Sequence, residues 1–161
     1  MPAMDHLKLP PPPLSPLLNL SVDVGGALDV GVGAFGRRRM VSILGGTFAG
    51  ALGQGRILAG GADWQLVVQD GTAAHLDARY VLEFDDGALV YVHNTALRLA
   101  TAEISAALMR GEVVPDDAVY FRCQPRFETA APHLAWLMQR QFIGTGVRRP
   151  ASVHLSFFTV G

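Results

Sequence analysis

Residues 64–99 read WQLVVQDGTAAHLDARYVLEFDDGALVYVHNTALRL, and this stretch decides the fold. Three apolar and β-branched runs within it are separated by Asp-Gly pairs, at residues 64–69, 74–84 and 88–99. Runs of this length, bounded by Asp70-Gly71 and Asp86-Gly87, are typical of strands joined by tight turns. The stretch therefore predicts a three-stranded antiparallel meander.

The same texture continues on both sides of the meander. Short apolar runs punctuated by glycine or proline predict further strands at residues 17–24, 40–44, 119–129, 141–147 and 153–160. A helix is expected at residues 101–110, where Thr101 can cap the first turn and Gly111 can end the last one. Leu134–Leu137 is expected to be a short helical turn, and Gly55–Gly61 a glycine-rich loop.

About eight strands with one inserted helix are typical of β-sandwiches and β-barrels. Several of the expected strands are apolar on both faces, which an open sheet with one wet face would not tolerate. The sequence therefore predicts an all-β protein, an antiparallel closed β-barrel.

The chain has 161 residues, half of them apolar, which suffices for one hydrophobic core and little more. Residues 1–16 hold six of the ten prolines, and a proline tract cannot donate hydrogen bonds to a sheet. We expect two parts, a Pro-rich N-terminal arm over residues 1–16 and a single β-barrel domain over residues 17–161.

Charge and hydropathy exclude several classes of partner. The 13 basic and 14 acidic residues are scattered, which argues against nucleic acid and against a polybasic membrane anchor. The one basic run, Arg37–Arg39, is interpreted as a solvated strand end. No apolar stretch is long enough for a signal peptide or a membrane span, so a cytoplasmic location is the default expectation.

The residues that usually hold metals or cofactors do not form a recognisable pattern. The five histidines show no metal-ligand spacing, and the single cysteine, Cys123, excludes an intrachain disulfide and a thiolate-rich zinc site. The glycine-rich residues 55–61 precede a strand and not a helix, so they lack the geometry that cradles a phosphate. No metal and no cofactor are expected.

Strand alternation gathers polar side chains in the meander. Asp63 and Gln65 share one face of their strand, and Asp77 and Arg79 share one face of the next. A two-residue turn at Asp86-Gly87 would place Asn94 opposite Arg79 and so on the same patch.

The register of the first hairpin decides whether this patch is continuous. An odd-length loop after Gln69 would place Asp63 opposite Arg79 and Gln65 opposite Asp77, whereas an even-length loop would break that pairing. We take the odd-length register as the favourable one.

In that register the patch lies inside the barrel near its mouth, as a candidate site for a small-molecule ligand. Asp63, Asp77 and Arg79 are the candidate catalytic residues, because a carboxylate in a partly apolar cavity can act as an acid or base beside an orienting arginine. Gln65 and Asn94 are candidate substrate-binding residues, and Trp64 or Tyr80 is expected to shape the wall. The alternative is an ion-pair network that only fixes strand register.

Several ordered blocks carry a resemblance to a known family. These are Gly45-Gly46-Thr47, Gly60–Gln65, Leu76–Tyr80, Tyr120-Phe121-Arg122 and Pro125–Thr129. Over residues 17–160 they resemble the family catalogued as domain of unknown function 3237. The resemblance implies a small β-barrel of calycin-like shape, often a homo-oligomer, and implies no particular reaction.

The resemblance adds two candidate residues and two departures. Tyr120 and Glu128 lie in the matching blocks and are further candidate substrate-binding residues, the alternative for Glu128 being a charge at a strand end or an interface. Family members commonly have asparagine where this chain has Met138, and glycine where it has Ala96. Loss of a polar contact near Met138 would fit a changed ligand.

Three functions remain open, in this order. The first is a cofactor-independent enzyme, an isomerase, lyase or hydrolase, acting by proton transfer on a small carbonyl or aromatic metabolite. The second is a non-catalytic protein that binds or carries an apolar small molecule. The third is an interaction scaffold that uses an outer face bearing Tyr91 and Phe84, which a helix or a second copy of the chain would otherwise cover.

Overall fold

The computed structural model describes residues 6–161. Most of them lie in nine antiparallel strands: β1 (Leu14–Gly33), β2 (Gly36–Gly50), β3 (Gly53–Ile57), β4 (Gly61–Val68), β5 (Ala73–Phe84), β6 (Leu89–Leu99), β7 (Tyr120–Thr129), β8 (Gln141–Arg148) and β9 (Ser152–Val160). One α-helix, α1 (Ala102–Met109), lies between β6 and β7. Short 3₁₀ segments span Gln69–Gly71, Asp116–Ala118 and Pro132–Gln139.

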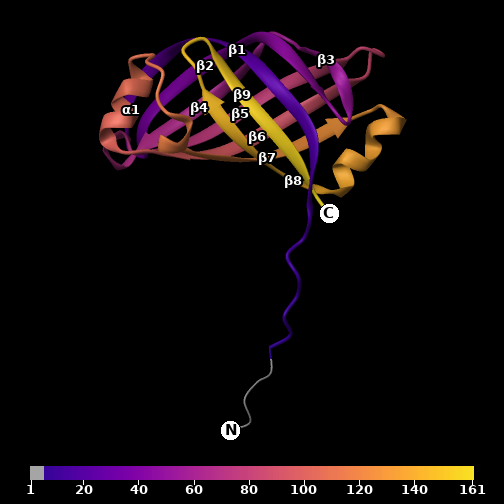
Figure 1. The fold of residues 1–161 in the computed structure, drawn as a ribbon. Coiled ribbons are helices and arrows are strands. Elements are labelled where there is room, and N and C mark those ends of the chain that lie inside the picture. Colours follow the sequence, from indigo (N-terminus) through magenta and orange to yellow (C-terminus); the bar gives the residue numbers. More distant parts are fainter. Residues whose placement is uncertain (1–5) are drawn as a thin grey trace.

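The strands close into a ring, which confirms the expected barrel (Figure 1). Strand β1 pairs with both β2 and β9, so the sheet has no free edge on either side of it. Strands β3 and β4 share one position in the ring, because β2 pairs with β3 through residues 47–50 and with β4 through residues 37–43. Nine strands therefore occupy eight positions around the barrel.

The first hairpin is longer than the sequence predicts. The sequence predicts strands at residues 17–24 and 40–44. In the structure β1 continues to Gly33, and β2 already begins at Gly36. The β1–β2 ladder shifts register three times between Asp23 and Gly31, so bulges let the strands continue past the glycines that suggested turns. The short strand β3 was also missed, because its glycines suggested a loop.

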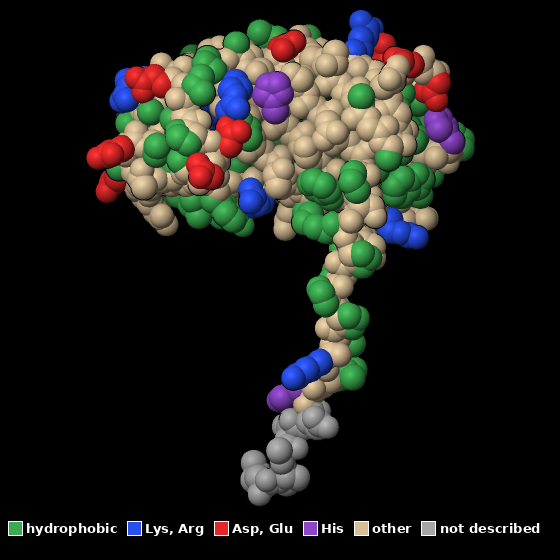
Figure 2. Space-filling model, in the orientation of Figure 1, with side chains coloured by type: hydrophobic (Ala, Val, Ile, Leu, Met, Phe, Trp, Pro, Cys, Tyr) green, Lys and Arg blue, Asp and Glu red, His purple; other side chains and the backbone are tan. Residues whose placement is uncertain are grey.

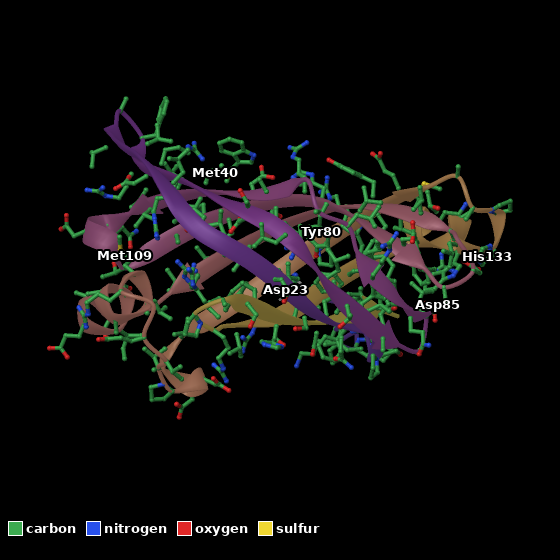
Figure 3. The ribbon with its side chains drawn as sticks, turned by 90° about the horizontal axis from the view of Figure 1, so that it is seen from above. Asp23, Met40, Tyr80, Asp85, Met109 and His133 are labelled. Atoms are coloured by element: carbon green, nitrogen blue, oxygen red, sulfur yellow. The ribbon has the colours of Figure 1, made fainter. Side chains whose placement is uncertain are left out.

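Inward-facing side chains fill one end of the barrel more tightly than the other. Aromatic rings pack edge to face in the part of the interior that adjoins the Pro132–Gln139 segment, where Phe127 contacts Phe142 and Phe157. Figure 3 labels His133 and Asp85 at this end and Met109, in α1, at the opposite end. The polar side chains described below lie toward the α1 end.

The helix and the N-terminal segment complete the described chain. The side chain of Thr101 accepts a hydrogen bond from the backbone amide of Ile104, as expected for the cap, and Gly111 has a φ of +77° after the last turn. Residues 6–13 have no secondary structure and extend away from the barrel (Figure 1), and Met1–Asp5 of the expected Pro-rich arm lie outside the described residues. No helix within residues 6–161 has the length and hydropathy to cross a bilayer.

Candidate functional site

A narrow cavity lies inside the barrel between the packed aromatic end and α1. The space between its lining atoms is about 540 Å³, its open mouth and adjoining solvent included. Its walls come from eight strands, all except β3, and are mostly aliphatic. Its polar lining residues are Asp63, Gln65, Tyr80, Asn94, Arg98 and Arg148.

Asp63 is held at the cavity wall by the strands on either side of it. The β4–β5 ladder is interrupted between Asp63 and Leu66, and in that interruption the backbone amide of Asp77 donates to Asp63 Oδ1 at 3.0 Å. Gln65 Nε2 donates to Asp63 Oδ2 at 2.9 Å. Each carboxylate oxygen therefore keeps one fixed partner and a further lone pair for a ligand.

Three buried oxygen atoms in the same cavity have no hydrogen-bond partner within the described residues 6–161. They are Gln65 Oε1, Tyr80 Oη and Asn94 Oδ1, on side chains whose residues are 2%, 4% and 4% exposed. Buried polar atoms without partners are rare in folded proteins because each costs free energy. Figure 3 labels Tyr80 near the middle of the barrel, between the Met109 and His133 ends. The cavity therefore offers hydrogen-bonding groups to a ligand.

Burial sets the proton affinity of Asp63. Desolvation raises the pKa of Asp63 above its ordinary value, and it outweighs the hydrogen bonds from Gln65 and Asp77 and the attraction of Arg98 and Arg148, which act in the opposite direction. Burial also raises the pKa of Tyr80, so its hydroxyl keeps its proton at neutral pH and can donate a hydrogen bond.

We expect the Asp63 carboxyl to titrate above the ordinary range of aspartate, and to titrate higher still in Arg98→Met. The second shift follows because Arg98 favours the ionised form of Asp63. The carboxyl-carbon NMR signal of Asp63, followed against pH, measures both values. Arg126→Met, which changes an exposed arginine on β7, is the control and should leave the titration unchanged. An Asp63 that titrates at or below the ordinary value would contradict this description of the cavity.

The structure does not bring Asp77 and Arg79 to this cavity. Asp77 Oδ1 lies 3.3 Å from Arg79 Nε and 2.9 Å from His93 Nε2, and Arg79 donates to Tyr91 Oη at 3.3 Å. The Arg79 side chain is 53% exposed. This cluster lies on the outer wall of the barrel, where ion pairs stabilise a fold only slightly. It matches the ion-pair alternative for these two residues.

Loop length explains the divided patch. The backbone amide of Phe84 donates to the carbonyl of Ala88 at 2.9 Å, so the turn itself spans three residues, 85–87, and not two. Gly87 has a φ of +88°, and in this register Arg79 faces His93 while Ala78 faces Asn94. The loop between β4 and β5 has four residues, so Asp63 faces Ala78. Both predicted registers were wrong by one residue, and a shift of one residue moves a side chain to the other face.

The remaining candidates are divided between the two faces. Gln65, Tyr80 and Asn94 line the cavity with Asp63. Trp64, Tyr120 and Glu128 are exposed on outward positions of β4 and β7. Of the two family departures, Ala96 lines the cavity, whereas Met138 lies exposed in the Pro132–Gln139 segment.

Sequence reasoning missed the arginines inside the barrel. Arg98 stands two and four residues beyond Ala96 and Asn94, so strand alternation alone places it on their face. Arg148 and Arg39 gave a weaker signal, since each stands in a run of arginines that suggested solvent. Arg39 is buried at 8% exposure, so the interpretation of Arg37–Arg39 as a solvated strand end was wrong for its last member.

No group of three potential metal ligands is present among residues 6–161. Cys123 is buried, and burial raises the pKa of its thiol to about 11, so little thiolate exists at neutral pH. The polar groups that line the cavity are the carboxyl of Asp63, the Tyr80 hydroxyl, the amides of Gln65 and Asn94, and the guanidinium groups of Arg98 and Arg148.

Comparison with known proteins identifies the family. Residues 12–160 match the model of the family described as Protein of unknown function (DUF3237). The chain belongs to the DUF3237 family. Curated relatives in this family include UPF0311 proteins of Rhodopseudomonas palustris and Clostridium acetobutylicum. The first is 42% identical over 126 residues, 78% of this chain and 80% of that protein, and the second 38% identical over 125 residues, 78% of each.

Solved structures agree with this barrel. The crystal structure of the R. palustris protein superposes with a TM-score of 0.89 at 35% identity, covering 96% of this chain and 100% of that one. A β-barrel like protein from Acinetobacter baumannii gives a TM-score of 0.82 at 38% identity, covering 97% and 100%. A protein described as an enzyme from Penicillium herquei gives a TM-score of 0.72 at 19% identity, covering 97% of this chain and 99% of that one. At this identity the likeness shows the fold alone.

Proposed function

We propose that this DUF3237 protein is a cofactor-independent enzyme that transfers a proton on a small carbonyl or aromatic compound bound inside the barrel. The observation that carries the proposal is the convergence of Asp63 with three unpartnered polar atoms on one otherwise aliphatic cavity. A raised carboxyl pKa brings an acid or base closer to neutral pH, where proton transfer in both directions is efficient.

The chemistry assigns one role to each polar group. Asp63, when ionised, removes a proton from the carbon next to a carbonyl: the C–H bond breaks, the proton passes to the carboxylate, and the electron pair moves onto the carbonyl oxygen as an enolate. The Tyr80 hydroxyl donates a hydrogen bond to that oxygen as its charge grows. Asn94 and Gln65 orient the substrate, and protonated Asp63 returns the proton to the same carbon or to another one.

The apolar remainder of the cavity supports this role. Leu76, Val41 and Leu155 are among the aliphatic side chains around the polar group. Exclusion of water by such a wall strengthens hydrogen bonds to a developing charge. The barrel architecture is compatible with catalysis, since a protein of the same fold is described as an enzyme.

The test is proton exchange at carbon. We expect the protein, incubated in heavy water with a panel of small aryl ketones and 2-oxo acids, to incorporate deuterium next to the carbonyl of at least one class, as read by mass spectrometry. Compounds that raise the melting temperature without gaining deuterium would instead assign the barrel to ligand binding or carriage. If no compound gains deuterium and none raises the melting temperature, both the enzymatic function and the binding function are wrong.

A further inference from the structure

Three arginines reach the α1 end of the interior from separate strands. Arg39 comes from β2, Arg98 from β6 and Arg148 from β8, and we call them the arginine trio. Arg98 and Arg148 line the Asp63 cavity, while Arg39 lies with Arg98 against the space beneath α1. Arg39 and Arg98 are each 8% exposed. Mutual repulsion within the trio adds to burial in lowering the pKa of Arg98, to about 10, and of Arg148.

The trio lacks the partners that the surface arginines have. Among residues 6–161, no hydrogen bond or ion pair engages the guanidinium of Arg39, Arg98 or Arg148. By contrast, five surface arginines form ion pairs: Arg37 with Asp29, Arg56 with Glu83, Arg79 with Asp77, Arg110 with Glu112 and Arg149 with Asp116. This reverses the usual arrangement, in which buried charges are paired and exposed ones need not be.

The interior carboxylate does not neutralise the trio. Asp63 lies close enough to attract Arg98 and Arg148 electrostatically, but its two oxygens take their hydrogen bonds from Gln65 and from the Asp77 amide. Arg98 and Arg148 therefore face one half-buried carboxylate, and buried Arg39 adds a third positive charge beside them. Such an arrangement costs free energy unless an anion enters.

We propose that the arginine trio binds an oxyanion of the substrate, a carboxylate or a phosphate group, at the α1 end of the cavity. Guanidinium groups present pairs of N–H donors that match the oxygens of both anions. With the oxyanion at this end, the rest of a small molecule lies toward Asp63 and Tyr80, in the middle of the barrel. The substrate is then a small organic acid or phosphate ester, an assignment that rests on the proposed function for its reacting part.

The test uses benzoate, inorganic phosphate and, as an uncharged analogue of benzoate, benzyl alcohol. Each is added to the full-length protein, to Arg98→Met, to Arg148→Met and to the surface control Arg126→Met, and the melting temperature is followed. We expect benzoate or phosphate to raise the melting temperature of the unaltered protein and of the control. In both interior variants, the same rise should require at least a tenfold higher concentration of the anion. Benzyl alcohol should give a smaller effect that is equal in all four proteins.

The outcomes separate the anion site from the catalytic role. Stabilisation by benzoate but not phosphate assigns a carboxylate, and the reverse assigns a phosphate group. No stabilisation by either anion, or stabilisation that survives unchanged in both interior variants, overturns the proposal. If the anion site is absent but Arg98→Met still exchanges deuterium into a neutral aryl ketone, the proton-transfer function stands without it. If the anions bind but no compound gains deuterium, the arginine trio is an anion site and the proposed enzymatic function is wrong.

Discussion

Asp63→Asn is expected to lower the rate of deuterium exchange by about 10²–10⁴-fold, the usual contribution of a positioned acid or base. The amide cannot take up a proton from carbon at neutral pH. The loss should appear in kcat more than in KM, because Asn94, Tyr80 and the arginine trio still hold the ligand. Exchange measured by mass spectrometry at several ligand concentrations separates the two constants.

The fold should tolerate this substitution. Asparagine at position 63 can still accept from the Asp77 amide, and the Gln65 amide can turn so that its unpartnered Oε1 meets the new NH₂ group. The matched control is Asp77→Asn, which alters the outer cluster and should change the exchange rate by less than about twofold, since the Asp77 side chain lies on the other face. If Asp77→Asn abolishes exchange and Asp63→Asn does not, the interior site is wrong.

Arg98→Met is expected to raise the free energy of unfolding of the ligand-free protein, by roughly 1–3 kcal/mol. Replacement of buried charge by an apolar side chain of similar length is often stabilising. The direction of this change in unfolding free energy follows from the lowered pKa of Arg98, because burial and Arg148 disfavour its charged form in the folded state. The penalty is therefore complete at neutral pH and is relieved only as pH rises above about 10.

Urea unfolding at neutral pH without added anions measures this effect. Arg126→Met, on the exposed face of β7, is the control and should lie within about 0.5 kcal/mol of the unaltered protein. Saturating benzoate or phosphate, whichever binds, should narrow the difference, because the ligand binds the unaltered protein more tightly and therefore stabilises it more than it stabilises Arg98→Met. A clear loss of stability in Arg98→Met without ligand would mean that Arg98 is a structural residue with an interior partner.

The sequence predicted the barrel because its signals are local. Alternating apolar runs and Asp-Gly turns identified the strands from Trp64 to Leu99, and the Thr101 cap identified α1. The long β1–β2 hairpin escaped because Gly25 and Gly31 suggest turns, whereas the structure accommodates that stretch through bulges. A bulge is decided by cross-strand contacts that a single sequence does not display.

The site was harder to predict because it depends on register. Asp63, Gln65, Tyr80 and Asn94 were all selected from the sequence, but the inward face was assigned through a two-residue turn that has three residues in the fold. Because of that difference of one residue, Tyr80 and not Asp77 or Arg79 faces the cavity. Strand alternation from Asn94 would have been enough to place Arg98 on the inward face. It was missed because its neighbours Leu97 and Leu99 are apolar and suggested that their own face was the inward one.

The most direct measurement is a crystal structure of the protein grown with benzoate, or with phosphate if that anion binds more tightly. The predicted result is an anion hydrogen-bonded to Arg98 or Arg148 inside the barrel, with the remaining cavity extending to Asp63 and Tyr80. An anion seated at Arg79 and His93 on the outer wall, with the interior closed by its own side chains, would contradict the account.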